Sequence, residues 1–197
     1  MEIPYLPYDR LRPIADDFLK NHNPNLEFPI PIEKIVDNDF AIDVVPTPGL
    51  HRTFDIDSYI TSDFSAIHVD EYVYESREKR YRFSLAHELS HLLLHRDVFA
   101  QLSFSNISEW KAAVTSIPER EYGLLEFQAN SLAGLILVPP AELSRRFDEI
   151  AETVKSHRFD IRDPAVMDRI EQRLASEFNV SQAVIHRRLE FDKLISA

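Results

Sequence analysis

A leucine-rich segment near the middle of the chain, FSLAHELSHLLL over residues 83–94, most strongly constrains what this chain can fold into. Its composition predicts a helix, and Glu88 is its only charged residue. A carboxylate among leucines is costly to bury unless something positive compensates its charge. His87 and His91 are four residues apart, so they share one face of the helix, about 6 Å apart along its axis. The segment therefore belongs in a core and needs a positive partner there, and a metal ion would supply one.

The H-E-x-x-H spacing of residues 87–91 is typical of zinc sites with two histidine ligands and a glutamate base. The chain contains no cysteine, so a transition-metal site must use His, Asp or Glu. A catalytic zinc ion usually has three protein ligands and one position open to water. The motif therefore predicts a third ligand from another part of the chain.

Three residues are candidates for this third ligand. His95 is eight residues from the first histidine of the motif, about 12 Å along a straight helix, whereas a Zn–N bond is about 2.0 Å. Asp97 matches the last position of H-E-x-x-H-x-x-G-x-x-H, but Leu94 replaces the glycine that turns the chain. Glu126 is the only charged residue of the apolar segment 122–140 and needs a partner if buried. We favour Glu126, with Asp97 and His95 as alternatives.

Two further polar residues lie where they could support the site. Asn130 follows Glu126 by four residues and shares its helix face. We interpret it as the acceptor of the spare N–H of a ligating imidazole, the alternative being an ordinary buried amide. His95 lies near the end of the predicted helix, where a histidine interacts favourably with the helix dipole. It is also a candidate for contacting substrate or a metal ligand.

The rest of the chain shows helical and extended patterns in turn. We expect strands over 40–46, ended by Pro46, and over 63–74, with β-forming residues over 51–60. Ser76 and Ser181 are expected helix N-caps. The predicted helices cover residues 9–21, 31–39, 76–95, 108–115, 118–138, 140–156, 164–178 and 181–195. This pattern predicts an α+β fold with a domain over 1–150 and a helical hairpin or helix-turn-helix-like appendage over 151–197.

Composition limits the cellular compartment and the binding partners that we expect for this chain. The chain is 44% hydrophobic with a net charge of −11, which disfavours general affinity for nucleic acid. The start, MEIPYLPYDR, has neither a basic end nor an apolar run, and the run 132–138 is too short to span a bilayer. We expect a soluble cytoplasmic protein that binds no membrane. Arg187 and Arg188 lie beside acidic residues, which favours a solvated or protein-docking face over phosphate contacts.

The segments RFSLAHELSHLLLH and EFQANSLAGLILVPP together resemble the ImmA/IrrE family of zinc-dependent peptidases. The resemblance covers residues 28–140 and extends more weakly to FNVSQAVIHRRL near the end. It implies that His87, His91 and Glu126 are metal ligands and that Glu88 is the general base. It also implies a zincin-like fold, in which a small twisted sheet lies beside the H-E-x-x-H helix and the glutamate helix packs against it.

Members of that family commonly cleave a helix-turn-helix repressor of the XRE type. The resemblance thus implies a cytoplasmic regulatory endopeptidase in transcription regulation or a stress response, with Zn²⁺ as the metal and Mn²⁺ or Fe²⁺ as alternatives. A second hypothesis is a non-catalytic metal-containing module that binds DNA or a repressor through its C-terminal helices. Glu88 and the absence of cysteine favour catalysis, because a structural zinc site needs no base and commonly uses cysteine.

The expected mechanism assigns the remaining roles in the site. Glu88 takes a proton from water and passes it to the leaving amine. The candidate donors to the oxyanion are Tyr74, Tyr81, His95 and Tyr122. A substrate strand is expected to pair beside residues 64–70, because edge pairing is a common way to dock peptides.

Overall fold

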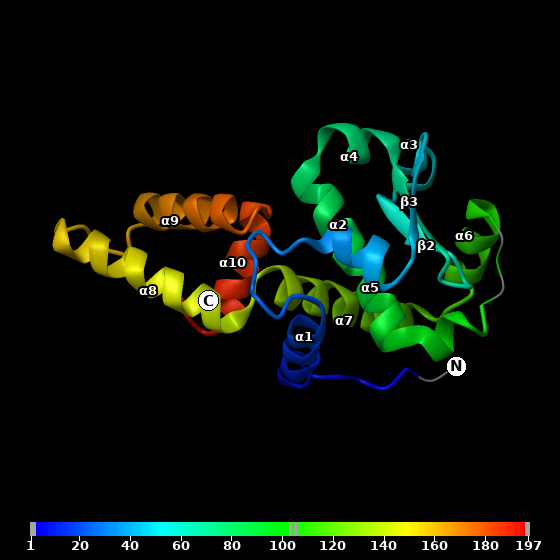
Figure 1. The fold of residues 1–197 in the computed structure, drawn as a ribbon, viewed down its shortest axis with the longest axis horizontal. Coiled ribbons are helices and arrows are strands. Elements are labelled where there is room, and N and C mark those ends of the chain that lie inside the picture. Colours follow the sequence, from blue (N-terminus) through cyan, green and yellow to red (C-terminus); the bar gives the residue numbers. More distant parts are fainter. Residues whose placement is uncertain (1–2, 103, 105, 196–197) are drawn as a thin grey trace.

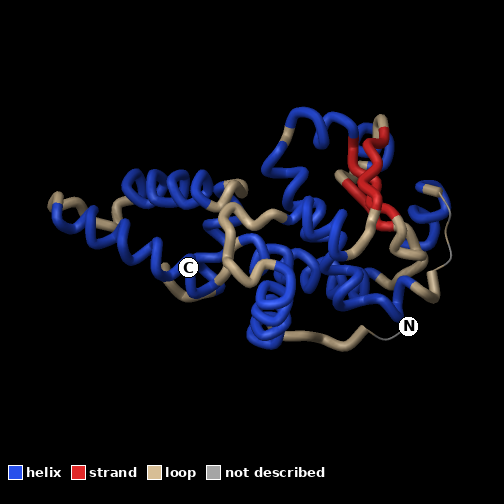
Figure 2. Tube along the Cα trace, in the orientation of Figure 1, coloured by secondary structure: helices blue, strands red, loops and turns tan. Residues whose placement is uncertain are grey.

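The computed structural model describes residues 3–102, 104 and 106–195. Most of this part of the chain is helical, with one small sheet (Figures 1 and 2). Its elements are, in order, α1 (Tyr8–His22), α2 (Ile32–Lys34), η1 (Ile35–Asp39), β1 (Asp43–Thr47), α3 (Leu50–Phe54), β2 (Ser58–Ile60), β3 (Ala66–Asp70), α4 (Glu71–Ser76), α5 (Glu78–Phe99), α6 (Ile107–Thr115), α7 (Glu119–Leu137), α8 (Pro140–Ser156), α9 (Pro164–Glu177) and α10 (Gln182–Phe191). The predicted α+β class is confirmed, and the described helices include none long and apolar enough to cross a membrane.

The sheet has the strand order β1-β3-β2. Strand β1 runs parallel to β3, with Val45 opposite His68, and β2 runs antiparallel to β3, with Tyr59 opposite His68. Because β3 is the central strand, both of its edges are already paired. The expected docking of a substrate strand beside residues 64–70 is therefore wrong, and the strands with an unpaired edge in this sheet are β1 and β2.

Helices α5 and α7 pack along each other and form the centre of the molecule (Figure 1). Leu85 and Leu89 of α5 and Leu132 of α7 are fully buried, as is Ile67 on the sheet. Burying each such side chain contributes about 1.5–3 kcal/mol. The apolar character of both helix segments is therefore explained by burial on nearly all sides.

The beginning of the H-E-x-x-H helix differs from the prediction. Asp70 ends β3 and accepts a hydrogen bond from the backbone N–H of Tyr72, so the β-forming run after it starts a helix instead of extending the strand. Ser76 is the last residue of α4 and not an N-cap, and Arg77 separates α4 from α5. At its other end α5 bends at His95 (φ −126°, ψ 19°) and continues to Phe99.

Two local expectations in the first half also need correction. Residues 50–54 form the short helix α3, which follows Gly49 in the left-handed region (φ 77°), so only the end of the β-rich run 51–60 is a strand. Pro46 lies inside β1 and does not end it. A proline is tolerated there because β1 is an edge strand, with an outer side that needs no ladder hydrogen bond.

The C-terminal helices project away from the sheet as α8 and α9, and α10 returns to pack against α7 (Figure 1). Ser181 caps α10 as predicted, with its Oγ accepting from Val184 N. Arg188 is buried, donates to Val138 O at 3.0 Å and pairs with Asp192 at 2.7 Å. The expectation that Arg187 and Arg188 lie on a solvated face is therefore wrong for Arg188. The division into units 1–150 and 151–197 and the helix-turn-helix character of the second stay predictions.

Candidate metal centre and active-site cleft

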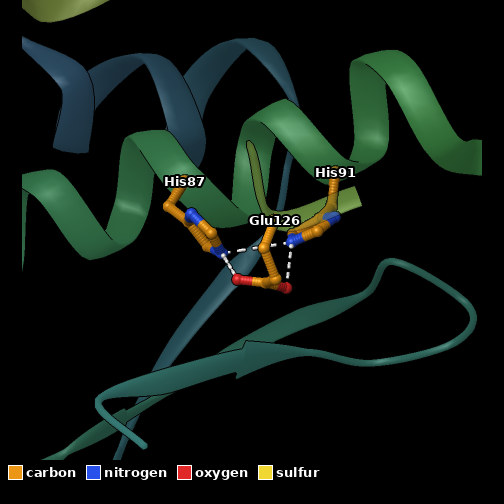
Figure 3. Close-up of side chains that lie close together, drawn as sticks. All are labelled: His87, His91 and Glu126. Atoms are coloured by element: carbon orange, nitrogen blue, oxygen red, sulfur yellow. Dashed lines mark hydrogen bonds and ion pairs between the residues drawn. The ribbon is translucent and has the colours of Figure 1, made fainter. Parts of the chain in front are cut away.

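Three side chains meet between α5 and α7: His87, His91 and Glu126 (Figure 3). The two histidine Nε2 atoms lie 3.1 Å apart. The Glu126 oxygens lie 3.5 Å from Nε2 of His87 and 3.4 Å from Nε2 of His91. Around one tetrahedral zinc ion with bonds of about 2.0–2.1 Å, neighbouring ligand atoms are about 3.3 Å apart. The residues present therefore fit a small divalent cation in both donor type and spacing.

The two alternative third ligands lie outside this group. Asp97 is exposed beyond the bend of α5. His95 is buried behind His91, on the side away from Glu126, with its Nδ1 atom 3.0 Å from Nδ1 of His91. The distance along a straight helix, which made His95 a less favoured ligand than Glu126, agrees with this placement.

Burial keeps His87 and His91 in the neutral form that a metal ligand requires. The pKa of His87 falls to about 4, mainly through desolvation and then through its neighbour His91. Desolvation lowers the pKa of His91 to about 3. Neutral rings offer a lone pair near neutral pH, so a cation does not have to displace a proton from either nitrogen.

A hydrogen-bonded relay extends from His91 into the core. With Nε2 of His91 directed at the cation position, its Nδ1–H donates to Nδ1 of His95. His95 then carries its proton on Nε2 and donates to Gln128 Oε1 at 2.9 Å. Gln128 in turn donates from Nε2 to the carbonyl oxygen of Pro4 at 2.9 Å. All donors point in one direction, so the relay sets a single tautomer for His91 and His95.

Sequence reasoning missed Gln128 and Pro4. In the structure, the Gln128 side chain is almost fully buried. Gln128 is a polar residue in the same apolar segment as Glu126. That signal was available from the sequence. Pro4 contributes only a backbone carbonyl, for which side-chain patterns give no indication.

The other ligand histidine is contacted by Asn130. The Asn130 side chain faces His87, and this contact acts to raise the pKa of His87, against the larger effect of burial. Asn130 comes from α7, one turn after Glu126, so one face of α7 carries both a candidate ligand and a partner for another candidate ligand. The expected position of Asn130 is thus matched by the structure, and its assigned role stays a proposal.

Glu88 lies beside the ligand group and is 5% exposed. Ser58 of β2 donates its hydroxyl to Glu88 Oε1 at 2.6 Å, and the backbone N–H of Ile60 also contacts the carboxylate. Burial raises the pKa of Glu88 to about 8, and nearby Glu126 adds to the rise, while the contacts from Ser58 and Ile60 lower it. Burial thus dominates the pKa of Glu88, and an edge strand moderates the rise, a contact that the sequence did not indicate.

These side chains open onto a cleft of about 360 Å³. Of the four candidate oxyanion donors, only Tyr122 lines this cleft with the ligands. Tyr81 donates to Glu33 at 2.8 Å, Tyr74 packs edge-on against Tyr81, and His95 lies behind His91. Burial and the charge of Glu126 raise the pKa of Tyr122 to about 12, so its hydroxyl keeps its proton and can donate it in a hydrogen bond.

Comparison with known proteins identifies relatives of this arrangement. The family model Peptidase_M78, described as the IrrE N-terminal-like domain, matches residues 39–190. Among solved structures, a Mycobacterium tuberculosis transcriptional regulator matches with a TM-score of 0.54 and 18% identity over 92% of this chain. The chain spans 48% of that regulator's length, and this likeness shows the fold alone. No curated protein matches.

Proposed function

The chain belongs to the IrrE N-terminal-like domain family, a metal-dependent peptidase family, and on that premise we propose that it is a regulatory zinc-dependent endopeptidase. The observation that carries the proposal is the buried carboxylate of Glu88 beside the group of His87, His91 and Glu126. A structural metal site has no use for a buried, unligated carboxylate next to its ligands. The proposed substrate is a helix-turn-helix repressor of the XRE type.

In the proposed mechanism, His87, His91 and Glu126 hold the cation, with Zn²⁺ favoured by two imidazoles and one carboxylate. When bound, zinc supplies Lewis-acid chemistry that lowers the pKa of a water and polarises a carbonyl. Mn²⁺ and Fe²⁺ tolerate the same donors.

Glu88 acts as general base and then as general acid. Beside a cation held by the neighbouring residues, Glu88 would have a pKa below the value of about 8 that burial gives it. The ionised carboxylate would then take a proton from the attacking water and deliver it to the nitrogen of the leaving amine. Ser58 holds one carboxylate oxygen through its 2.6 Å hydrogen bond, which leaves the other oxygen to face the water. Ser58 therefore orients the base and, by stabilising its charge, keeps its pKa from rising further.

Tyr122 is the proposed donor to the oxyanion. Its protonated hydroxyl lines the cleft and hydrogen-bonds Glu126, and in the proposed mechanism it turns to donate to the developing negative charge. The backbone of β2 has an unpaired edge beside the cleft, because β2 is an outer strand and Ser58 lines the cleft. We propose this edge as the place where the substrate backbone pairs.

The test is cleavage of purified XRE-type repressors by the zinc-loaded protein, with new chain ends identified by mass spectrometry. We expect cleavage of one repressor at a defined bond, and its loss with Glu88→Gln although zinc is retained. Glu121→Gln is the matched control, since Glu121 is a carboxylate at the start of α7 that does not line the cleft. Equal cleavage by Glu88→Gln and the wild type would contradict the proposed role of Glu88.

A further inference from the structure

We propose that a cationic groove next to the candidate active site binds an acidic, extended segment of the polypeptide substrate. This inference rests on the proposed peptidase function and adds a substrate class to it. The groove has a volume of about 670 Å³ and lies between the start of α5, α7 and α10. Its cationic lining residues are Arg77, Lys79, Arg80, Arg187 and Arg188. We call it the basic groove.

Two of the five cations are already neutralised within the protein. Arg80 is paired with Asp57, which also lines the groove. Arg188 is buried and paired with Asp192, so it supports the wall and is not available to a ligand. Glu78, the other carboxylate of the lining, accepts a hydrogen bond from Asn179. The remaining cations must account for any attraction of a ligand.

Arg77, Lys79 and Arg187 are exposed and have no carboxylate partner within the described part of the chain. Arg77 lies over the ring of Tyr72, and Lys79 contacts the carbonyl of Ala175 at 3.4 Å. Even with the Glu78 carboxylate counted against them, three unpaired cations leave this cavity net positive in a chain with a net charge of −11. A concave surface focuses such a field, so the groove attracts anionic groups that the rest of the surface repels.

The basic groove is continuous with the active-site cleft. Four residues line both cavities: Asp57, Arg80, Phe83 and Asn130. Asn130 also contacts the candidate ligand His87. An extended chain with its scissile bond in the cleft would therefore run past Asn130 into the groove. Continuity of this kind favours a segment of the substrate over a separate small anion.

Part of the groove lining is apolar. Phe83 lies where the two cavities join, and Tyr8 and Phe191 stack with ring centroids 4.7 Å apart on another part of the lining. A ligand matching these features carries carboxylates with an aromatic or aliphatic side chain among them. Duplex DNA fits less well, because α10 also presents the exposed Glu190 and the whole chain is acidic.

The test measures binding of a fluorescein-labelled peptide by the full-length zinc-loaded protein. The probe has about 12 residues, long enough in extended form to cover the groove, and alternates Glu with Gly around one central Phe. A second probe replaces every Glu with Lys, and a third is a labelled DNA duplex. The protein carries Glu88→Gln so that cleavage does not consume the peptides, and binding therefore reports on the groove whether or not the protein is a peptidase.

The test variant is Arg77→Glu/Arg187→Glu, and Arg169→Glu/Lys155→Glu is the control, since both control positions are exposed and outside the groove. We expect the acidic probe to bind at least about tenfold more tightly than the basic probe. The affinity for the acidic probe should fall at least about tenfold in the test variant and about twofold in the control variant. The milder Arg77→Gln/Arg187→Gln replaces the test variant if charge reversal impairs folding, with loss again expected.

Equal binding of the two peptides, equal loss in test and control variants, or tighter binding of the duplex through Arg187 would overturn the inference. Failure of the proposed peptidase function would give a different pattern of results. In that case the acidic probe would still bind through Arg77 and Arg187, while no repressor would be cleaved by the wild type.

Discussion

The relay behind His91 predicts that residues without any contact to the cation control its affinity. Replacing His95 with Phe keeps a ring of similar size but removes the acceptor for the Nδ1–H of His91, now 3.0 Å away. Partners of this kind typically contribute about 10–100-fold to metal affinity, which corresponds to about 1.4–2.7 kcal/mol. The donor group of His91 would be left buried and unpaired, so we expect the upper half of that range.

Gln128 allows the same reasoning to be tested one residue further along. Gln128→Leu removes the acceptor that keeps the proton of His95 on Nε2. His95 could then place its proton on Nδ1, opposite the N–H of His91, so we expect zinc affinity to fall by about tenfold.

The assay is competition for zinc against a chelator of known affinity at neutral pH. Ser90→Ala is the matched control, because the buried Ser90 hydroxyl donates to Ala86 O at 2.7 Å in the same helix without contacting the ligands. We expect Ser90→Ala to change zinc affinity by less than about twofold. If His95→Phe and Gln128→Leu bind zinc as tightly as Ser90→Ala, the relay does not act on the metal site.

Three further outcomes are expected. Ser58→Ala removes a hydrogen bond that lowers the pKa of Glu88, so the acidic limb of the pH profile of kcat/KM should move to higher pH. An unchanged acidic limb would show that Ser58 does not control the pKa of Glu88. In metal-free protein the pKa of Glu88 is about 8 against an ordinary 4.5, so wild-type stability should fall across this pH interval. Denaturant titration should then show that metal-free Glu88→Gln is more stable than the wild type at about pH 9, by up to several kcal/mol. Below about pH 4.5 the two proteins should differ little in stability. A difference that does not grow with pH would contradict this. Arg188→Met should destabilise the fold by about 1–3 kcal/mol, because Val138 O loses its donor while Asp192 keeps Arg12 and Tyr8 as partners; the exposed neighbour variant Arg187→Met should cost less than about 0.5 kcal/mol, and equal losses would contradict this role of Arg188.

The helical half of the fold was largely predictable because its signals are local. The helices from Ile107 to Ser156 and the cap at Ser181 agree with the predicted ranges to within a few residues. The run 71–76 was misassigned because its valine and tyrosines favour strands. The helix-starting hydrogen bond of Asp70 decides the conformation instead, and it depends on one side-chain oxygen.

The positions of the candidate ligands were predictable, but their surroundings were not. Lone charges in apolar helices single out Glu88 and Glu126, since burial without compensation is costly wherever the helices pack. Ser58 contacts Glu88, thirty residues later in the sequence, through the pairing of β2, and no periodicity encodes such a contact. The central position of β3 likewise depends on strand order, which the separate strand patterns do not determine.

The most direct test of the central claim is the zinc content of purified wild type, Glu126→Ala and Glu88→Gln by elemental analysis. The proposed site predicts about one zinc ion per chain in the wild type and in Glu88→Gln, and a large loss in Glu126→Ala, because Glu126 is the only one of these two carboxylates assigned as a ligand. Full zinc content in Glu126→Ala, or none in the wild type after zinc is supplied, would contradict it.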